Sequence, residues 1–404
     1  MAGNNFVASI DIGTEKIALL AADIEDAGHL RIVAHNFCSS DGVKKGSLSS
    51  IDSLARVIIR LIEKTKKDFG YKVELARINI SDTHLTCSDG KGKVSINEVV
   101  TLKDLDSVLE SAMAMSTPTN KEKLHIIKKK FTINENVVVD NPMEMEAEVL
   151  ESKVHIVTVS SSSIRNIERC LEQSNLEAEK IVLNSIAKSH AVLSQEDKDS
   201  GICLVDIGAG VTSYSVFNEE GIVRSGIIAI GGNEITQDIA YAFNTSVEEA
   251  NRLKENYGVA KSSTLKEDKF IHFTQNKEEH QLSSLELSEV IEGAYCEIFK
   301  LLDNELKHHN LGAILKSGFV LCGGGAQINS IVELGRDFFS NRVKIGQIQR
   351  DRISGLETIL TDHKFTGAIG LLLHEEDLSN NQLAMSKTDQ SVIDKLKKVI
   401  VGKF

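Results

Sequence analysis

Little in this sequence suggests disorder, disulfides or a membrane span. Its 404 residues contain only 2 prolines and 28 glycines, which leaves little room for long flexible linkers. The 6 cysteines are scattered and form no Cys-x-x-Cys pair, a pattern typical of a reducing cytosol that offers no metal site. No apolar run reaches about 18 residues, so no transmembrane helix is expected.

The chain is also short of positive charge. Its 46 Lys and Arg residues face 58 Asp and Glu residues, which gives a net charge of -12, whereas nucleic-acid binding needs clustered cations. The basic run Lys121–Lys130 is interrupted by apolar residues and is interpreted as the solvated edge of a strand or helix. We therefore expect no nucleic-acid partner.

Length and composition indicate a globular protein of more than one domain. A chain of 404 residues is too long for one ordinary core, and 41% hydrophobic with 26% charged residues is the usual globular balance. The segment Met1–Asn5 shows no basic stretch leading into an apolar core, so no signal peptide is expected. The prediction is a cytoplasmic protein.

One arrangement of strands occurs twice. Phe6–Ile10 runs into Asp11-Ile12-Gly13-Thr14, and Ile202–Val205 runs into Asp206-Ile207-Gly208-Ala209-Gly210. Each copy continues through two more strand-like segments that are joined by glycine-containing turns, as in antiparallel meanders. Two copies of one uncommon pattern, separated by most of a domain, predict an internal duplication in an α/β protein.

Helical segments follow the strands. Ser50 and Gly70 are positioned to begin and end a helix over Ile51–Asp68, and Leu285–Asn310 has the apolar spacing of one long helix. The stretch between Asp82 and Val159 has two short strand-like runs, a helix and a turn-rich region, which predicts an inserted α+β subdomain.

The two aspartate hairpins have the features of phosphate-binding turns. Glycine lets backbone N–H groups approach phosphate oxygens without a Cβ in the way, and hydroxyls can add donors. An aspartate at the strand end repels phosphate but can hold the waters of a Mg²⁺ ion. The predicted phosphate residues are Asp11, Gly13, Thr14, Asp206, Gly208, Gly210 and Thr212 or Ser213, with Asp11 and Asp206 also holding Mg²⁺ through water.

A third glycine-rich turn follows a short apolar strand. Gly323-Gly324-Gly325 precedes apolar residues at helical spacing, so a flat base could lie against bare backbone near a helix N-terminus. The turn does not match the Rossmann fingerprint, and no GxxxxGK[ST] loop occurs in the chain. Phosphates would therefore be held by the two hairpins.

With these motifs in this order, the chain resembles the actin, Hsp70 and sugar-kinase superfamily over essentially its whole length. The insertion after the first hairpin and the amphipathic C-terminus resemble one branch, the FtsA family of bacterial cell division proteins. The resemblance implies an actin-like ATPase fold: two duplicated RNase H-like halves around a nucleotide cleft, an inserted α+β subdomain and a C-terminal amphipathic helix. It also places Gly232, Asn233 and Lys254 beside the ribose and base of ATP, and the connecting helices at Asn184–Leu193 and Phe365–Leu373.

The resemblance suggests the following division of the chain. The first half of domain 1 spans 1–83, the insertion 84–160 and the rest of domain 1 161–199. Domain 2 spans 200–364 and includes a smaller subdomain at about 235–310. A closing helix at 365–374, a polar tether at 375–390 and a membrane-targeting helix at 391–404 complete it.

Several positions depart from the family pattern. The first connecting helix usually opens with Glu-Pro and small residues, but here it reads Asn184-Ser185-Ile186-Ala187-Lys188-Ser189, and Asn251 stands where an acidic residue is expected. Lys16 is not at the position of the phosphate lysine of actin. No general base stands out beyond Asp206 acting through Mg²⁺-bound water. We therefore expect tight ATP binding with slow or negligible hydrolysis.

The C-terminal segment predicts a membrane-surface helix. An apolar stripe with lysines around it suits anionic lipid, and the alternative is a helix docked on the protein's own core. One such helix binds only marginally, so polymerisation would be needed for durable attachment. The membrane-binding residues would be Val392, Ile393, Leu396, Lys397, Val399, Ile400 and Phe404.

The function implied by the resemblance is a self-assembling, ATP-binding protein of the division ring. It would sit on the cytoplasmic face of the inner membrane at the division site, bind the C-terminal peptide of FtsZ through the smaller subdomain, and recruit later division proteins. Two alternatives remain open at this point: a pilus-assembly relative that binds ATP, and a sugar or acetate kinase, for which no aspartate base is evident.

Overall fold

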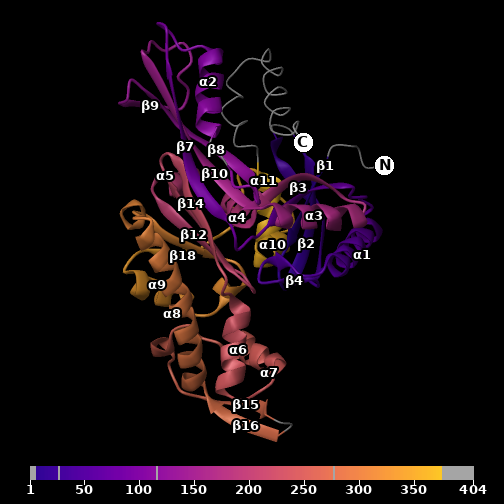
Figure 1. Ribbon diagram of the computed structural model, residues 1–404. Coiled ribbons are helices and arrows are strands. Elements are labelled where there is room, and N and C mark those ends of the chain that lie inside the picture. Colours follow the sequence, from indigo (N-terminus) through magenta and orange to yellow (C-terminus); the bar gives the residue numbers. More distant parts are fainter. Residues whose placement is uncertain (1–5, 26–27, 115–116, 276–277, 375–404) are drawn as a thin grey trace. The chain divides into compact units, whose positions relative to one another are not determined.

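The computed structural model describes residues 6–25, 28–114, 117–275 and 278–374. The predicted tether and C-terminal amphipathic helix lie outside these residues. These described residues form two compact units, one within the ranges 6–87, 117–125 and 157–374, and the other from residues 88–114 and 126–156. Figure 1 labels many of their helices and strands.

The first sheet of the larger unit begins with an antiparallel meander. Strands β1 (Phe6–Ile12), β2 (Lys16–Ile24) and β3 (Leu30–Ser39) pair in succession. Strand β6 (Leu75–Ile80) lies parallel to β1, and β11 (Glu177–Leu183) lies parallel to β6. The order is β11-β6-β1-β2-β3, extended at β3 by β19, Ile353–Ser354.

The second sheet repeats this topology. Strands β12 (Ile202–Ile207), β13 (Thr212–Asn218) and β14 (Gly221–Ile228) form the meander. Strands β17 (Gly318–Cys322) and β18 (Val343–Ile345) then add in parallel on the side of β12. The order β18-β17-β12-β13-β14 matches β11-β6-β1-β2-β3, so the predicted duplication is confirmed.

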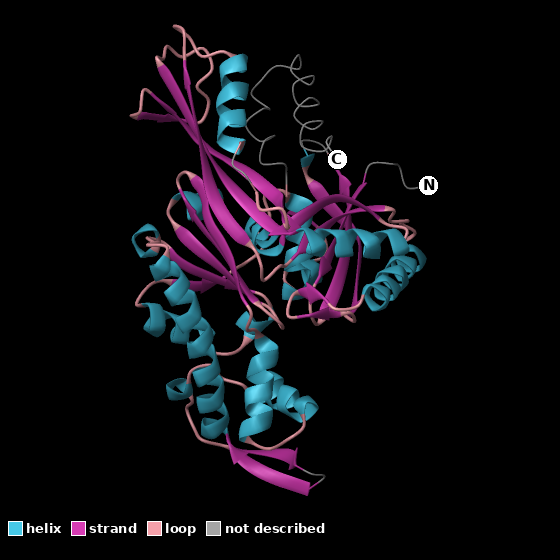
Figure 2. Ribbon diagram, viewed as in Figure 1, coloured by secondary structure: helices cyan, strands magenta, loops and turns pink. Residues whose placement is uncertain are grey.

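Helices cover both faces of the sheets (Figure 2). On one side of the first sheet lies α1 (Ile51–Phe69), which packs against α3 (Ser161–Gln173). Helix α11 (Thr366–Leu373) contacts β1, β2 and β6 of that sheet, and α4 (Asn184–Val192) contacts strands of both sheets and packs on α11. The expected start and end of α1 are confirmed: the Ser50 hydroxyl accepts from Ser53 N–H, and Gly70 has φ +82°.

The alternation of side chains along β1 and β12 explains where the aspartates point. Ile10 belongs to the core beneath α1, and Ile207 to the core that includes α8 (Ser284–His308). Neighbouring residues of a strand face opposite sides. Asp11 therefore faces α11, and Asp206 faces α4. Two buried carboxylates from equivalent strands thus lie against the connecting helices.

A smaller helical part extends from the second sheet. Helices α6 (Gly232–Ala242) and α7 (Val247–Tyr257) pack together, and α6 packs on the long α8. The hairpin of β15 (Phe270–Gln275) and β16 (Glu278–Ser283) leads into α8. Elsewhere in the larger unit, short elements include β4 (Val43–Lys44), β5 (Ser47–Leu48), α5 (Gln195–Asp199), α9 (Ile331–Phe339) and α10 (Glu357–Leu360).

The inserted sheet has the order β7-β10-β8-β9. Its strands are β7 (Thr86–Ser95), β10 (Val149–Ser160), β8 (Lys121–Ile133) and β9 (Val137–Val139), with α2 (Leu102–Met113) packed through Leu105 and Val108 into its core. The two separate strand-like runs expected before α2 form a single strand, β7. Gly90 and Gly92 explain the close fit, because a Cβ at either position would overlap a carbonyl oxygen of α2.

Among the helices of the described residues, none is both long enough and apolar enough to cross a membrane.

Close packing of α11 on α4 depends on glycine, and this can be tested. A Cβ on Gly370 would overlap the Ala187 carbonyl of α4, so Gly370→Ala should lower the free energy of unfolding by about 1–3 kcal/mol, the usual range for overpacking. The control is Gly293→Ala in α8, where no atom lies within 4 Å of the new methyl group. Because alanine is the better helix former, that variant should be unchanged or slightly more stable. Equal melting temperatures for the two variants would contradict this account.

Candidate functional site

The tips of the two hairpins have the same backbone geometry. Gly13 N–H donates to the Lys16 carbonyl at 2.9 Å, and Gly208 N–H donates to the Val211 carbonyl at 2.9 Å. A Cβ on either glycine would lie 2.9 Å from that carbonyl oxygen, closer than real Cβ atoms approach. The sequence repeat is therefore a structural repeat of one turn that requires glycine.

The hairpin tips approach each other. A Cβ on Gly210 would lie 2.6 Å from the Thr14 hydroxyl and 3.0 Å from the Cα of Lys45. The Thr14 hydroxyl also accepts the Gly46 N–H at 3.1 Å, which ties the first tip to the β4–β5 turn. A phosphate chain between the tips would meet backbone on both sides.

The glycine-rich turn after β17 lies directly against the second hairpin. Gly323 has φ +87°, and a Cβ there would overlap the Asp206 carboxylate. A Cβ on Gly325 would lie 2.5 Å from the Ile207 side chain, and the Gly325 carbonyl accepts a hydrogen bond from Tyr295 at 2.6 Å. Two of the three glycines are thus required by close approach to β12, and Gly324 is left open to the cavity.

These turns surround a cavity of about 600 Å³. Lys254, predicted to lie beside the base, lines it and donates to the Gly232 carbonyl at 3.0 Å and to the Thr236 hydroxyl at 2.6 Å. Burial lowers the pKa of Lys254. The cavity brings together the predicted residues Asp11, Gly13, Thr14, Asp206, Gly208, Gly210, Gly232, Asn233, Lys254, Gly323, Gly324 and Gly325.

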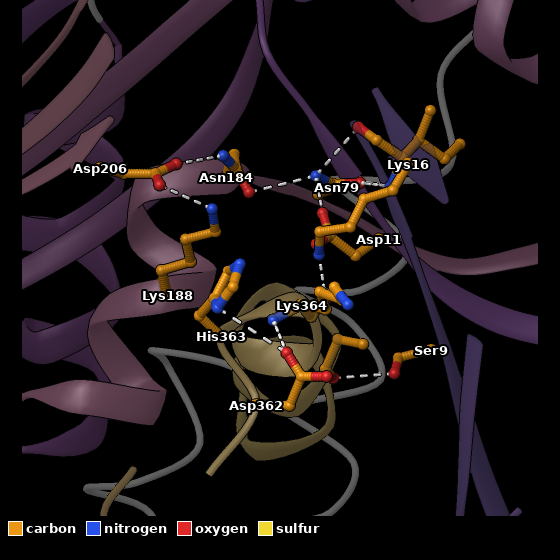
Figure 3. A network of polar contacts seen from close by, with 12 residues as sticks. Ser9, Asp11, Lys16, Asn79, Asn184, Lys188, Asp206, Asp362, His363 and Lys364 are labelled. Atoms are coloured by element: carbon orange, nitrogen blue, oxygen red, sulfur yellow. Dashed lines mark hydrogen bonds and ion pairs between the residues drawn. The ribbon is translucent and has the colours of Figure 1, made fainter. Parts of the chain in front are cut away.

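A chain of amide hydrogen bonds connects the two aspartates (Figure 3). The Asn79 amide donates to Asp11 Oδ1 at 2.6 Å and to Asn184 Oδ1 at 3.1 Å. The Asn184 amide donates in turn to Asp206 Oδ2 at 2.8 Å. Asn79 also accepts the Ile12 N–H at 2.6 Å. Because every link is buried, the relative position of the two carboxylates is set by these two asparagines.

Lysines neutralise both carboxylates. Lys188 Nζ lies 2.7 Å from Asp206 Oδ1, with both side chains buried. Burial alone would lower the pKa of Lys188, but the carboxylates of Asp206 and Asp11 raise it, so this side chain is an ammonium ion. Lys16 Nζ lies 3.9 Å from Asp11 Oδ2 and donates to the Lys364 carbonyl. Burial lowers the pKa of Lys16, against the opposing effect of Asp11.

Neither Thr212 nor Ser213, the two alternatives for one predicted phosphate donor, is among the residues that line the cavity, and Thr212 points away from it. Thr212 is fully buried, and its hydroxyl donates to the Ile230 carbonyl at 2.9 Å. Residues on β13 alternate between the two faces of the sheet, so Ser213 instead reaches Asp206, at 3.3 Å from Oδ2. The alternative donor named with Thr212 is therefore the one that faces the site.

Sequence reasoning missed several residues that line the cavity. Asn79 lies at the end of β6, and His363 and Lys364 lie just before α11. Only the unusual opening of the first connecting helix gave a signal, at Asn184 and Lys188. Asn251, which stands where an acidic residue is expected, accepts from Thr236 at 3.5 Å and donates to Glu255 at 2.9 Å.

The donors around Asp206 do not fit a Mg²⁺ ion held through that carboxylate. Mg²⁺ is bound by one or two carboxylates together with phosphate oxygens, but Oδ1 of Asp206 already faces the Lys188 ammonium. Its Oδ2 accepts from Asn184 and Ser213. For the same reason Asp206 is a poor holder of a catalytic water. The predicted metal role of Asp11 stays a prediction.

Comparison with known proteins places the chain among bacterial division proteins. The family described as "Cell division protein FtsA" matches residues 203–370, and "SHS2 domain inserted in FTSA" matches residues 82–158. Cell division protein FtsA of Pseudomonas aeruginosa is 30% identical over 410 residues, with 98% of each chain covered. FtsA of Escherichia coli K12 is 28% identical over 381 residues, with 91% of this chain and 89% of the relative covered.

Solved structures show the same fold at low identity. A PilM–PilN type IV pilus biogenesis complex matches with a TM-score of 0.64 at 15% identity, covering 91% of this chain and 97% of that one. MreB5 of Spiroplasma citri bound to ADP matches with a TM-score of 0.55 at 14% identity and 99% coverage of both chains. At such identities the likeness shows the fold alone, and it is the predicted actin-like one.

The asparagine chain yields a stability prediction. Asn79→Ala removes the partner of Asp11 Oδ1, of Ile12 N–H and of Asn184 Oδ1 at once, so it should lower the free energy of unfolding by about 1–3 kcal/mol. Thermal unfolding without nucleotide measures this. Asn233→Ala, which changes an asparagine of the same cavity lying outside this chain of hydrogen bonds, is the control and should leave the melting temperature close to the wild-type value. Equal losses in both variants would contradict the role of Asn79.

Proposed function

The chain belongs to the FtsA family of cell division proteins, and from that premise we propose that it binds ATP in the cavity between its hairpins and assembles on the membrane. The observation that carries the proposal is the duplicated glycine turn. Two equivalent tips, each with the same backbone bond, face one another across a cavity that also contains a third glycine-rich turn. Such a pair can hold a phosphate chain from both sides.

The adenosine end of the nucleotide would lie near Gly232, Asn233 and Lys254, with the base against Gly324. Support comes from the open face of Gly324, where the nearest atom to an added Cβ is His363 Nε2 at 3.9 Å. The actin-like neighbour MreB5 is described as bound to ADP. ATP binding would favour one arrangement of the cleft, and assembly would be coupled to it by differential affinity.

Hydrolysis by this protein should be slow. A general base needs a free carboxylate or imidazole within hydrogen-bond reach of the attacking water. Asp206 is paired with an ammonium and accepts from three neutral donors, Asn184, Ser213 and the Cys322 thiol. The amide of Asn184, on α4, cannot act as a base. The nucleotide would act as a conformational ligand rather than a substrate with rapid turnover.

Assembly and partner contacts complete the proposal. The smaller part of the second half, about residues 235–310, would bind the C-terminal peptide of FtsZ, and it exposes the apolar side chains of Tyr241, Val247 and Phe270. The insertion would make polymer contacts and recruit later division proteins. The segment 391–404 would bind anionic lipid, so the protein would be peripheral on the cytoplasmic face of the inner membrane at the division site and would tether the FtsZ ring there.

Two other functions are less well supported. A pilus-assembly role rests on a fold likeness at 15% identity, whereas the FtsA relative reaches 30% over nearly the full length, and the lysine-rich amphipathic tail also favours the division role. A sugar or acetate kinase needs an aspartate base in the cleft. Among the described residues, the buried aspartates of the cavity are Asp11 and Asp206, and both are paired with lysine.

The purified protein should bind ATP and turn it over far below about 1 s⁻¹, the low end of ordinary enzymes. Slow turnover is expected because the Asp206 carboxylate is paired with the Lys188 ammonium and accepts hydrogen bonds from Asn184 and Ser213. Isothermal calorimetry and phosphate release measure the two properties. Turnover at or above that rate would overturn the proposed role as a conformational switch.

Removal of residues 391–404 should abolish co-sedimentation with vesicles that contain phosphatidylglycerol, because the apolar stripe supplies the inserted surface. The single change Ile400→Glu should weaken co-sedimentation strongly, and Lys397→Arg, which keeps the charge, should not. The truncated protein must retain wild-type ATP binding to serve as the comparison. Undiminished pelleting of the truncated protein would rule out the tail as the membrane anchor.

A further inference from the structure

We propose that the Lys188 ammonium takes the place of a divalent cation beside Asp206, so that the cavity binds nucleotide phosphates without a metal ion. This inference rests on the proposed nucleotide binding and adds to it the identity of the counter-charge. It arises from the disagreement between the cation expected at the two aspartates and the donors that surround Asp206. It extends to Asp11, whose Oδ1 accepts from Asn79 and whose Oδ2 lies 3.9 Å from Lys16 Nζ.

The position of Lys188 in α4 brings it to the carboxylate. Residues four apart on a helix share a face, and Asn184 and Lys188 both reach Asp206 from α4. Asn184 donates to Oδ2 at 2.8 Å, and Lys188 donates to Oδ1 at 2.7 Å. One turn of one helix therefore supplies a donor to each carboxylate oxygen, and Ser213 adds a second donor to Oδ2.

The charge of the cavity is already balanced by protein side chains. Four carboxylates line it, and four lysines line it as well. A divalent cation is retained where oxygen ligands carry excess negative charge, and the protein side chains of the cavity supply no such excess. The repulsion between Asp206 and a phosphate, which a metal ion would otherwise relieve, is removed by an ammonium ion that belongs to the chain.

Lys188 also has capacity left for a ligand. An ammonium group has three N–H donors, and among the residues that the structure describes its hydrogen bond goes to Asp206. Lys188 lines the cavity, and Figure 3 shows its amino group beside Asp206. The remaining donors can bind phosphate oxygens directly, with the strength of charge-assisted hydrogen bonds.

The competing explanation is a purely structural ion pair. Removing one member of a buried pair destabilises a protein whatever its function, so a loss of stability in a Lys188 variant decides nothing. The two explanations differ in metal dependence. Only the proposed role predicts that the ATP affinity of the wild-type protein is independent of Mg²⁺. It also predicts that ATP binding becomes dependent on Mg²⁺ when the ammonium is removed.

The experiment measures ATP affinity of the full chain by calorimetry, once with Mg²⁺ and once with EDTA. Wild-type affinity should agree within about threefold between the two conditions. Lys188→Met keeps the length of the side chain and removes the charge, and it should lose at least about tenfold in affinity in EDTA and recover most of it with Mg²⁺. Lys300→Met, at an exposed lysine of α8, is the matched control and should behave as wild type in both conditions.

Should Lys188→Met fail to fold, the double variant Lys188→Met/Asp206→Asn removes both charges of the pair. It should fold and bind ATP equally with and without Mg²⁺, because no carboxylate remains at Asp206 to attract a metal; a Mg²⁺ requirement in it would overturn the inference.

Two results would overturn the inference alone: wild-type binding that needs Mg²⁺, or Lys188→Met binding in EDTA with undiminished affinity. Failure of the wild type to bind ATP in either condition would overturn the proposed function, and the inference with it.

Discussion

The structure depends on the neutralisation of two buried carboxylates, Asp11 and Asp206, that end equivalent strands of two sheets. Leaving either one unpaired in the interior would be costly. Helix α4 places Asn184 and Lys188 on one face, and both side chains donate to the Asp206 carboxylate. Asn79 donates both to Asn184 and to Asp11, which connects the two aspartates. A single chain of hydrogen bonds thereby relates the two halves of the duplication, and the hairpin tips take their positions from it.

Close backbone packing makes this arrangement possible. Gly370 lets α11 lie against the Ala187 carbonyl of α4, and Gly367 leaves room for the Asp11 carboxylate beside α11. Gly323 does the same for Asp206 at the third turn. The cavity is therefore bounded by bare backbone at several points, which suits a ligand that carries both phosphates and a flat base. Asn184 and Lys188 at the centre of this site underlie the proposal that the protein holds a nucleotide and hydrolyses it slowly.

Much of the fold could be predicted because its signals are local. Helix α1 begins after Ser50 and ends at Gly70 as expected, and α8 covers nearly the predicted range. The two similar meanders correctly indicated the duplication. The prediction for the insertion was less accurate, since its two expected strands form one continuous strand, β7. The prediction failed because a short polar stretch such as Asp89-Gly90 resembles a turn in the sequence. In the structure Gly90 stays within the strand, where its missing Cβ accommodates α2.

The sequence by itself determined the turn chemistry: glycine at Gly13 and Gly208, the aspartates before them, and the third glycine turn, since each is set by backbone sterics within a few residues. Only the tertiary structure decided which side chains meet. Asn79, Asn184 and Asp206 are far apart in the chain, and no periodicity reports that they form one network. Thr212 and Ser213 were interchangeable as sequence, but the pleat of β13 sends the first to the Ile230 carbonyl and the second to Asp206. The sequence showed only that Lys188 lies in a helix that departs from the family pattern. The tertiary structure showed that its ammonium neutralises the Asp206 carboxylate.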